Sequence, residues 1–174
     1  MKTCGACNLC CKVLQVESLA KPAGRLCEHA MGGRGCAIHG RHPADCQAFA
    51  SGWLQWEDLG EAWKPDVARF LIRNEPSRGR LSIDVDPEHP DAWRAAAYYP
   101  TIKAWAAAVR AQGACVLVYA GPNTTVVFPE ADIDIGPFGE EELVLGYRGK
   151  GPRRRPFVRL RRDGEVVREW AAPG

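Results

Sequence analysis

The sequence predicts an α+β protein in which a loop-rich N-terminal cysteine module packs on a mainly antiparallel sheet with one or two helices. The first fifty residues hold seven of the eight cysteines and show no sustained apolar period of 3.6 or 2. Most of the remaining chain consists of short apolar runs separated by turn residues, with amphipathic stretches among them. A chain of 174 residues can bury one core, so the cysteine-rich part need not carry the whole fold.

The first apolar elements follow directly after the cysteines. Residues 49–64 carry tryptophans and leucines at a spacing close to that of a short helix with one apolar face, which we expect to seal the cysteine-rich part against the rest. Two further runs, 68–74 and 81–86, are separated by Glu-Pro-Ser-Arg-Gly-Arg, whose turn residues predict a hairpin. The first run could instead form one or two turns of helix.

A longer helix and several strands are expected after these runs. Pro100 suits the first residue of a helix that ends at Gly113. Four apolar residues share one face of it: Ile102, Trp105, Ala106 and Val109. The expected strands are 115–119, 124–128, 143–147, 157–161 and 166–170. The last two flank Asp163-Gly164, the strongest short hairpin signal in the chain.

We therefore divide the chain into a cysteine-rich metal-binding module, residues 1–50, and an α+β domain, residues 51–174. No apolar run approaches the roughly 18 residues that span a bilayer, so we expect no membrane partner. The first residues pass directly into the cysteines and leave no room for a charged leader and an apolar stretch. We accordingly expect a cytoplasmic protein.

The cysteines are the main functional signal. An odd, tightly clustered set does not suit a secreted disulfide scaffold, and thiols in a reducing compartment more often bind metal. Cys-x-x-Cys spacing lets two thiolates converge on one ion, and thiolates favour zinc, iron and copper(I). Tetrahedral zinc takes only four ligands, so two metal centres, or one cluster with spare thiols, fit the count better. The expected ligands are most or all of Cys4, Cys7, Cys10, Cys11, Cys27, Cys36 and Cys46.

These residues resemble a known family, the CxxCxxCC zinc- or iron-chelating proteins, also called YkgJ-type cysteine-cluster proteins. Four elements match in order: Cys4-x-x-Cys7-x-x-Cys10-Cys11, Arg25-Leu26-Cys27, Gly35-Cys36-Ala37-Ile38-His39, and His42-Pro43-Ala44-Asp45-Cys46-Gln47-Ala48-Phe49. The following Gly52-Trp53-Leu54 is also similar, whereas His42 departs from the family, which commonly has Arg there. The resemblance covers the first third of the chain and implies metal chelation without naming a substrate.

The metal stays open between zinc and iron, with an iron–sulfur cluster as one form of the latter. Cys4, Cys7 and Cys10 match the start of a bacterial cluster-binding run, but the expected Cys-Pro is absent, so a remote ligand such as Cys46 must complete it. An iron–sulfur redox protein acting on a small substrate or partner is therefore an alternative to a structural or storage site. No catalytic residue is identified, and whether the protein is an enzyme is undecided.

For the histidines, the eighth cysteine and a group of acidic residues, a structural role is the simpler interpretation. His29, His39 and His42 lie among the cysteines but are expected to be loop residues, with His39 the best candidate ligand. Cys115 opens an apolar run and is expected in the core. Four acidic residues are expected at solvent-facing positions rather than around magnesium. These are Asp84, Asp86, Glu88 and Asp91.

Charge is uneven along the chain. Residues 51–147 hold fifteen acids against eight bases, whereas residues 148–174 hold nine bases against three acids. The basic C-terminal strand region interleaves arginines with aromatic residues, so an RNA-associated adaptor is a third hypothesis. A solvated strand face protected by arginine is the simpler interpretation of the same residues.

Overall fold

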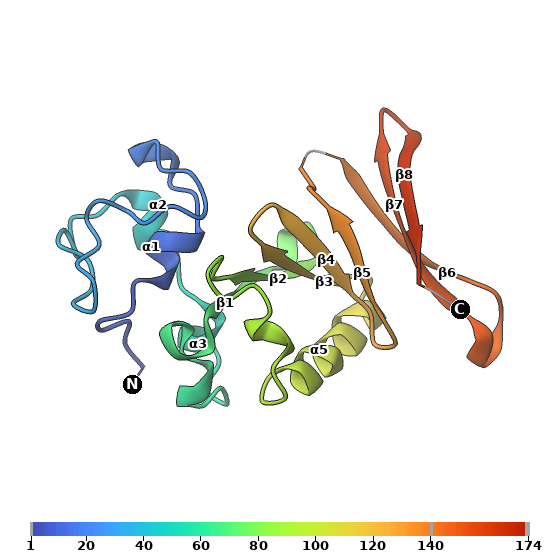
Figure 1. Cartoon of the computed structure of the whole chain (residues 1–174), viewed down its shortest axis with the longest axis horizontal. Helices are drawn as coiled ribbons and strands as arrows, with labels where there is room; N and C mark the ends of the chain where they lie inside the picture. The colour runs from blue at the N-terminus through green and yellow to red at the C-terminus, as the bar shows by residue number, and fades with distance from the viewer. Residues whose placement is uncertain (1, 140, 173–174) are drawn as a thin grey trace.

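The computed structural model describes residues 2–139 and 141–172, and it confirms the α+β class (Figure 1). The helices are α1 Leu9–Val13, α2 Ala44–Ala48, α3 Gly52–Gln55, α4 Pro65–Ala68 and α5 Tyr99–Ala111. The strands are β1 Phe70–Glu75, β2 Arg80–Val85, β3 Cys115–Ala120, β4 Asn123–Val127, β5 Asp132–Gly136, β6 Glu142–Arg148, β7 Arg155–Arg162 and β8 Glu165–Ala171. No helix in this part of the chain is long and apolar enough to cross a membrane.

Five strands form one sheet in the order β1-β2-β3-β4-β5. The predicted hairpin of β1 and β2 is confirmed, with Phe70 opposite Val85. β2 and β3 are parallel, with Arg80 opposite Cys115, because the chain crosses over through the predicted helix α5. The remaining pairs are antiparallel. The sheet is therefore mainly antiparallel with one βαβ crossover, which the sequence patterns did not predict.

One face of this sheet carries the main core. Strand residues such as Phe70, Ile83 and Val118 are fully buried there against α5 and against the segment around α3. On α5, Ile102 and Ala106 are buried, as the predicted apolar face requires, while Trp105 and Val109 are partly buried. The predicted helix over residues 49–64 is wrong in extent, since only α3 and a 3₁₀ turn, Glu61–Trp63, are helical.

The other face is divided into an apolar half and a charged half. Over β3, β4 and β5 it packs on the second sheet, whose order is β6-β7-β8, through Leu117, Ile135 and Leu160. Asp163 and Gly164 both have positive φ, which makes the β7–β8 turn the tight hairpin that their sequence predicts. Over β1 and β2 the same face carries Leu71 beside the charged residues Arg73 and Asp84.

The charged half overturns one expectation. Asp84 and Asp86 were expected to face solvent, but they are 8% and 2% exposed. Arg73 contacts both carboxylate oxygens of Asp84, at 2.6 and 3.1 Å. Lys12 on α1 lies 2.6 Å from Asp86. Each buried carboxylate is therefore matched by a cation, which is how proteins tolerate buried charge.

The Arg73–Asp84 pair generates a stability prediction. Burial raises the pKa of Asp84, and its contact with Arg73 opposes that rise. Arg73→Met would leave a buried carboxylate without a partner, so we expect a loss of about 2–4 kcal/mol in the free energy of unfolding. Arg78→Met is the matched control in the same hairpin, because the Arg78 side chain is 66% exposed, and it should cost less than about 0.5 kcal/mol. Chemical denaturation measures both.

The loss of unfolding free energy in Arg73→Met should change with pH in a defined direction. Without Arg73 the pKa of Asp84 rises further above its value in the unfolded chain. A carboxyl of this kind stabilises the fold below its unfolded pKa and loses that contribution as the pH rises through its folded pKa. The deficit of Arg73→Met should therefore be smaller at about pH 5 than at about pH 8. An equal deficit at both values would mean that loss of Arg73 does not move the pKa of Asp84 within this pH range.

Candidate metal centre

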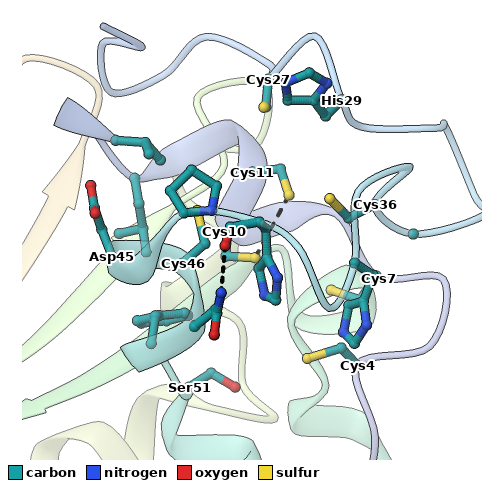
Figure 2. A pocket seen from close by; sticks show the side chains of 18 of the residues that line it. Cys4, Cys7, Cys10, Cys11, Cys27, His29, Cys36, Asp45, Cys46 and Ser51 are labelled. Atoms are coloured by element: carbon teal, nitrogen blue, oxygen red, sulfur yellow. Dashed lines mark hydrogen bonds between the residues drawn. The ribbon is translucent and has the colours of Figure 1, made fainter. Parts of the chain in front are cut away.

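All seven clustered cysteines line a single cavity of about 440 Å³ (Figure 2). Three of the four histidines, His29, His39 and His42, line the same cavity. Apolar side chains complete its wall, among them Phe49 and Leu71. Ten possible metal-ligand side chains, seven thiols and three imidazoles, thus surround one space, whose volume is in the range of small-molecule sites.

The first wall of the cavity is built by α1 and the turn before it. The Cys7 backbone N–H donates to the Cys4 carbonyl at 3.0 Å, which closes a turn around the Cys-x-x-Cys pair. Cys10 and Cys11 lie on α1, with their sulfurs 4.0 Å apart. The buried residues Leu9 and Val13 hold this helix against Leu71 on β1.

The second wall is a pair of loops tied to the first by backbone contacts. The Cys27 N–H donates to the Cys11 carbonyl at 2.9 Å, and Cys36 forms an antiparallel bridge with Ala30. Gly35 approaches the turn before α1 so closely that a Cβ there would meet the Gly5 carbonyl oxygen at 2.8 Å. Glycine at position 35 therefore lets the Cys36 loop reach the Cys4 and Cys7 turn.

Helix α2 closes the cavity with Cys46. The Cys46 N–H donates to the Pro43 carbonyl at 3.0 Å in the first turn of this helix. Asp45 accepts a 3.0 Å hydrogen bond from the Ser18 hydroxyl, which joins α2 to the loop after α1. The rings of His39 and His42 stack at 5.1 Å just before α2. Both rings line the cavity, so either could replace a thiolate as a ligand.

Electrostatics distinguish the thiols from one another. Burial raises the pKa of Cys4, Cys7 and Cys46. The Cys10 thiol hydrogen-bonds to Cys11, which raises the pKa of Cys10 and lowers that of Cys11. A metal ion that binds these groups must therefore displace protons from most of them.

Backbone amides also act on one sulfur. The backbone amides of Leu9 and Asp66 favour the thiolate form of Cys7 and so oppose the rise in its pKa that burial causes. Asp66 belongs to α4, so the α+β domain contributes directly to the environment of a module cysteine. Its Oδ1 is buried without a hydrogen-bond partner among the described residues.

Sequence reasoning missed one charged residue beside the cysteines. Lys21 is 7% exposed and pairs with Val16 in a short antiparallel bridge. Burial lowers the pKa of Lys21, while Cys27 and Cys11 oppose that change. No pattern in the chain marks this lysine, because a lysine in a polar loop is ordinarily exposed.

The donor set fits a soft metal in number and kind. The described residues contain no group of three or more Cys, His, Asp or Glu side chains gathered tightly enough to hold an ion as they stand. Yet in tetrahedral zinc–thiolate sites the sulfurs are roughly 3.8 Å apart, close to the 4.0 Å between Cys10 and Cys11. Rotation about the cysteine χ1 angles can bring further sulfurs inward, since each donor already borders the same cavity.

Residues outside the module take other roles. Contrary to expectation, Cys115 is not a fully buried core residue but lies partly buried against the core between the two sheets, where burial raises its pKa to about 11. Several arginines of the basic C-terminal strands pair with glutamates of the same strands or of the segment just before β6. Examples are Arg148 and Arg159 with Glu169, and Arg162 with Glu141. These ion pairs offset part of the positive charge of the basic strands, and the RNA-associated adaptor stays a prediction.

Comparisons with known proteins gave no information on function. A scan of protein-family models gave no match for this chain. Searches of curated proteins and of solved structures likewise gave no match.

Proposed function

We propose that the protein binds zinc or iron through the thiolates of the cysteine-rich module, as the resemblance to the CxxCxxCC family implies. One observation carries the proposal: seven cysteines from four separate stretches of chain line a single cavity together with three histidines. Cysteines without such a role are usually scattered as small residues in or beside the core, as Cys115 is. The convergence of seven has no packing explanation, since several of them line open space rather than the core.

The protein would supply three things to a bound ion. The cysteine thiolates would supply the ligands, with His39 as the nearest imidazole in sequence to Cys36. The Leu9 and Asp66 amides would stabilise negative charge on Cys7. Apolar neighbours such as Phe49 and Leu71 would limit water access, and hydrogen bonds to sulfur together with low solvent exposure are the factors that tune thiolate–metal sites.

The donor set alone does not select the metal. Thiolates bind zinc and iron–sulfur clusters alike, and the four-thiolate geometry serves both. Zinc would make the module a structural or storage site, whereas an iron–sulfur cluster would support electron transfer to a small substrate or protein partner. We propose a cytoplasmic location for either form, because a reducing compartment preserves thiols.

Metal analysis of protein purified without oxygen tests the proposal. We expect metal bound to each chain, measured as zinc, iron and acid-labile sulfide per chain. Zinc without visible absorption would exclude the redox form. Iron with sulfide and an absorption band that dithionite bleaches would support it. Protein that neither carries metal nor takes up added Zn²⁺ or Fe²⁺ under these conditions would contradict the proposal.

Cysteine variants test the ligand set. Cys7→Ser and Cys46→Ser should each lower the bound metal per chain and expose residues 2–50 to limited proteolysis, because ligation supplies folding free energy to such a segment. Cys115→Ser is the matched control, since Cys115 lies between the sheets and not on the cavity. It should retain full metal content. Full metal content in both module variants would show that the ligand assignment is wrong.

Thiol alkylation gives an independent readout. In the metal-loaded protein at neutral pH we expect the seven module cysteines to be protected from a small alkylating reagent, and a chelator should make them reactive. Cys115 should react slowly in both states, because its pKa of about 11 leaves little thiolate. Peptide mass analysis reports each cysteine separately. Equal reactivity of the module cysteines with and without chelator would argue against ligation.

A further inference from the structure

The second sheet, β6-β7-β8, packs on the first sheet with only one of its two faces. On β7, Val158 and Leu160 are fully buried against the first sheet. The alternate residues Phe157 and Arg159 therefore lie on the outer face, and both are partly exposed. In Figure 1 this sheet forms the right-hand end of the molecule, with the connection between β6 and β7 at its lower edge.

One end of the outer face concentrates positive charge. Arg148 on β6 lies directly opposite Arg155 on β7, and like charges at such positions destabilise a sheet. The connection between the two strands adds three more basic side chains, those of Lys150, Arg153 and Arg154. Five basic residues within eight positions thus surround one end of this hairpin.

Acidic residues offset only part of this charge. Arg148 and Arg159 share the carboxylate of Glu169, and Arg154 lies 3.7 Å from Glu130. Three further basic residues make no ion pair with any residue that the structure describes. These are Lys150, Arg153 and Arg155. A bound polyanion would relieve the repulsion at this end of the sheet.

An aromatic ring lies beside these charges on the same face. Phe157 is opposite Gly146, and a Cβ at position 146 would meet the ring at 2.5 Å, so glycine lets the ring lie over the β6 backbone. The guanidinium carbons of Arg159 and Arg148 lie 4.6 and 5.5 Å from the ring centroid. Aromatic rings and guanidinium planes are the surfaces on which unpaired nucleobases stack.

We propose that the β6–β7 end of this outer face binds single-stranded nucleic acid. Arg153 and Arg155 would contact backbone phosphates, and a nucleobase would stack beside Phe157. Eight of the nine basic residues in 148–174 are arginine, which binds phosphate through a planar fork and stacks on aromatic rings. The ring favours a single strand, because the nucleobases of a duplex are stacked on one another and do not offer their faces. The inference does not depend on the metal proposed for the cysteine-rich module.

Fluorescence anisotropy on the full chain tests the proposal. The probes are labelled oligouridylate and oligodeoxythymidylate of about 12 nucleotides. We expect a dissociation constant of about 1–100 μM at moderate salt. The logarithm of the association constant should fall with the logarithm of the salt concentration with a slope of about −2 to −3.5, as roughly three to five phosphate contacts require. Binding of either strand supports the proposal, and the tighter of the two distinguishes RNA from DNA.

Three results with the wild-type chain would overturn the proposal. The first is the absence of binding to both oligonucleotides. The second is tighter binding to a duplex of the same length than to either single strand. The third is equally tight binding of a polyglutamate peptide, which would indicate an acidic protein as the partner.

Variants separate the phosphate contacts from the stacking. The double variant Arg153→Gln and Arg155→Gln should weaken binding by about tenfold and make the salt slope shallower by about 1.4, because two phosphate contacts are lost. Phe157→Leu keeps an apolar side chain over Gly146 but removes the ring. It should weaken binding by about 5- to 100-fold with an unchanged salt slope. Phe157→Tyr retains the ring and should bind as the wild type does.

A matched control removes two charges elsewhere on the same sheet. Arg162 and Arg168 both contact Glu141, before the start of β6, so the double variant Arg162→Gln and Arg168→Gln should bind as the wild type does. A loss equal to that of the Arg153 and Arg155 variant would overturn the proposed location. Wild-type affinity in Phe157→Leu would overturn the stacking role. Should Phe157→Leu fail to fold, the exposed Arg153 and Arg155 still decide the location, and thermal unfolding of each variant verifies the fold.

Discussion

The packing of Leu9 and Val13 against Leu71 is the contact on which the candidate site depends. A helix of five residues such as α1 is not stable in water by itself, because nucleation costs more than so few hydrogen bonds return. The sheet supplies the missing stabilisation through this apolar contact and through the ion pair of Lys12 with Asp86. Cys10 and Cys11 thereby have a defined place that does not depend on a ligand.

Much of the fold could be predicted because its elements carry local signals. The alternation in β6, β7 and β8 and the Asp163-Gly164 turn act over a few residues, so the sequence shows them directly. β5 escaped prediction because its alternating run is short, with Ile133 and Ile135 as its apolar residues, and because aspartate is depleted in strands. The structure shows why Asp132 is tolerated: it lies 2.9 Å from Lys103 on α5, a partner 29 positions away in the sequence. The parallel pairing of β2 and β3 likewise depends on where α5 packs, which no local pattern states.

For the candidate site, the cysteines could be predicted from the sequence, but the charged residues around them could not. Cysteine is rare and chemically distinct, so a cluster of seven indicates shared chemistry from the sequence alone. The charges around the cluster were not predictable, because lysine and aspartate are ordinarily surface residues. Asp86 is buried since α1 brings Lys12 to it, and Lys21 is buried since the Val16–Lys21 bridge turns its side chain back onto α1. Both facts arise from tertiary packing.

The two sides of the cavity should therefore respond differently to metal. Cys10 and Cys11 sit on a helix that the sheet core holds in place. Cys27, Cys36 and Cys46 are held mainly by isolated backbone hydrogen bonds and short helical turns, which supply little stability alone. Ligation would contribute its folding free energy chiefly to that second side. The proposed metal binding would thus be coupled to folding over the loops of the module. The two sheets and α5 have a buried core that contains no cysteine from the cluster.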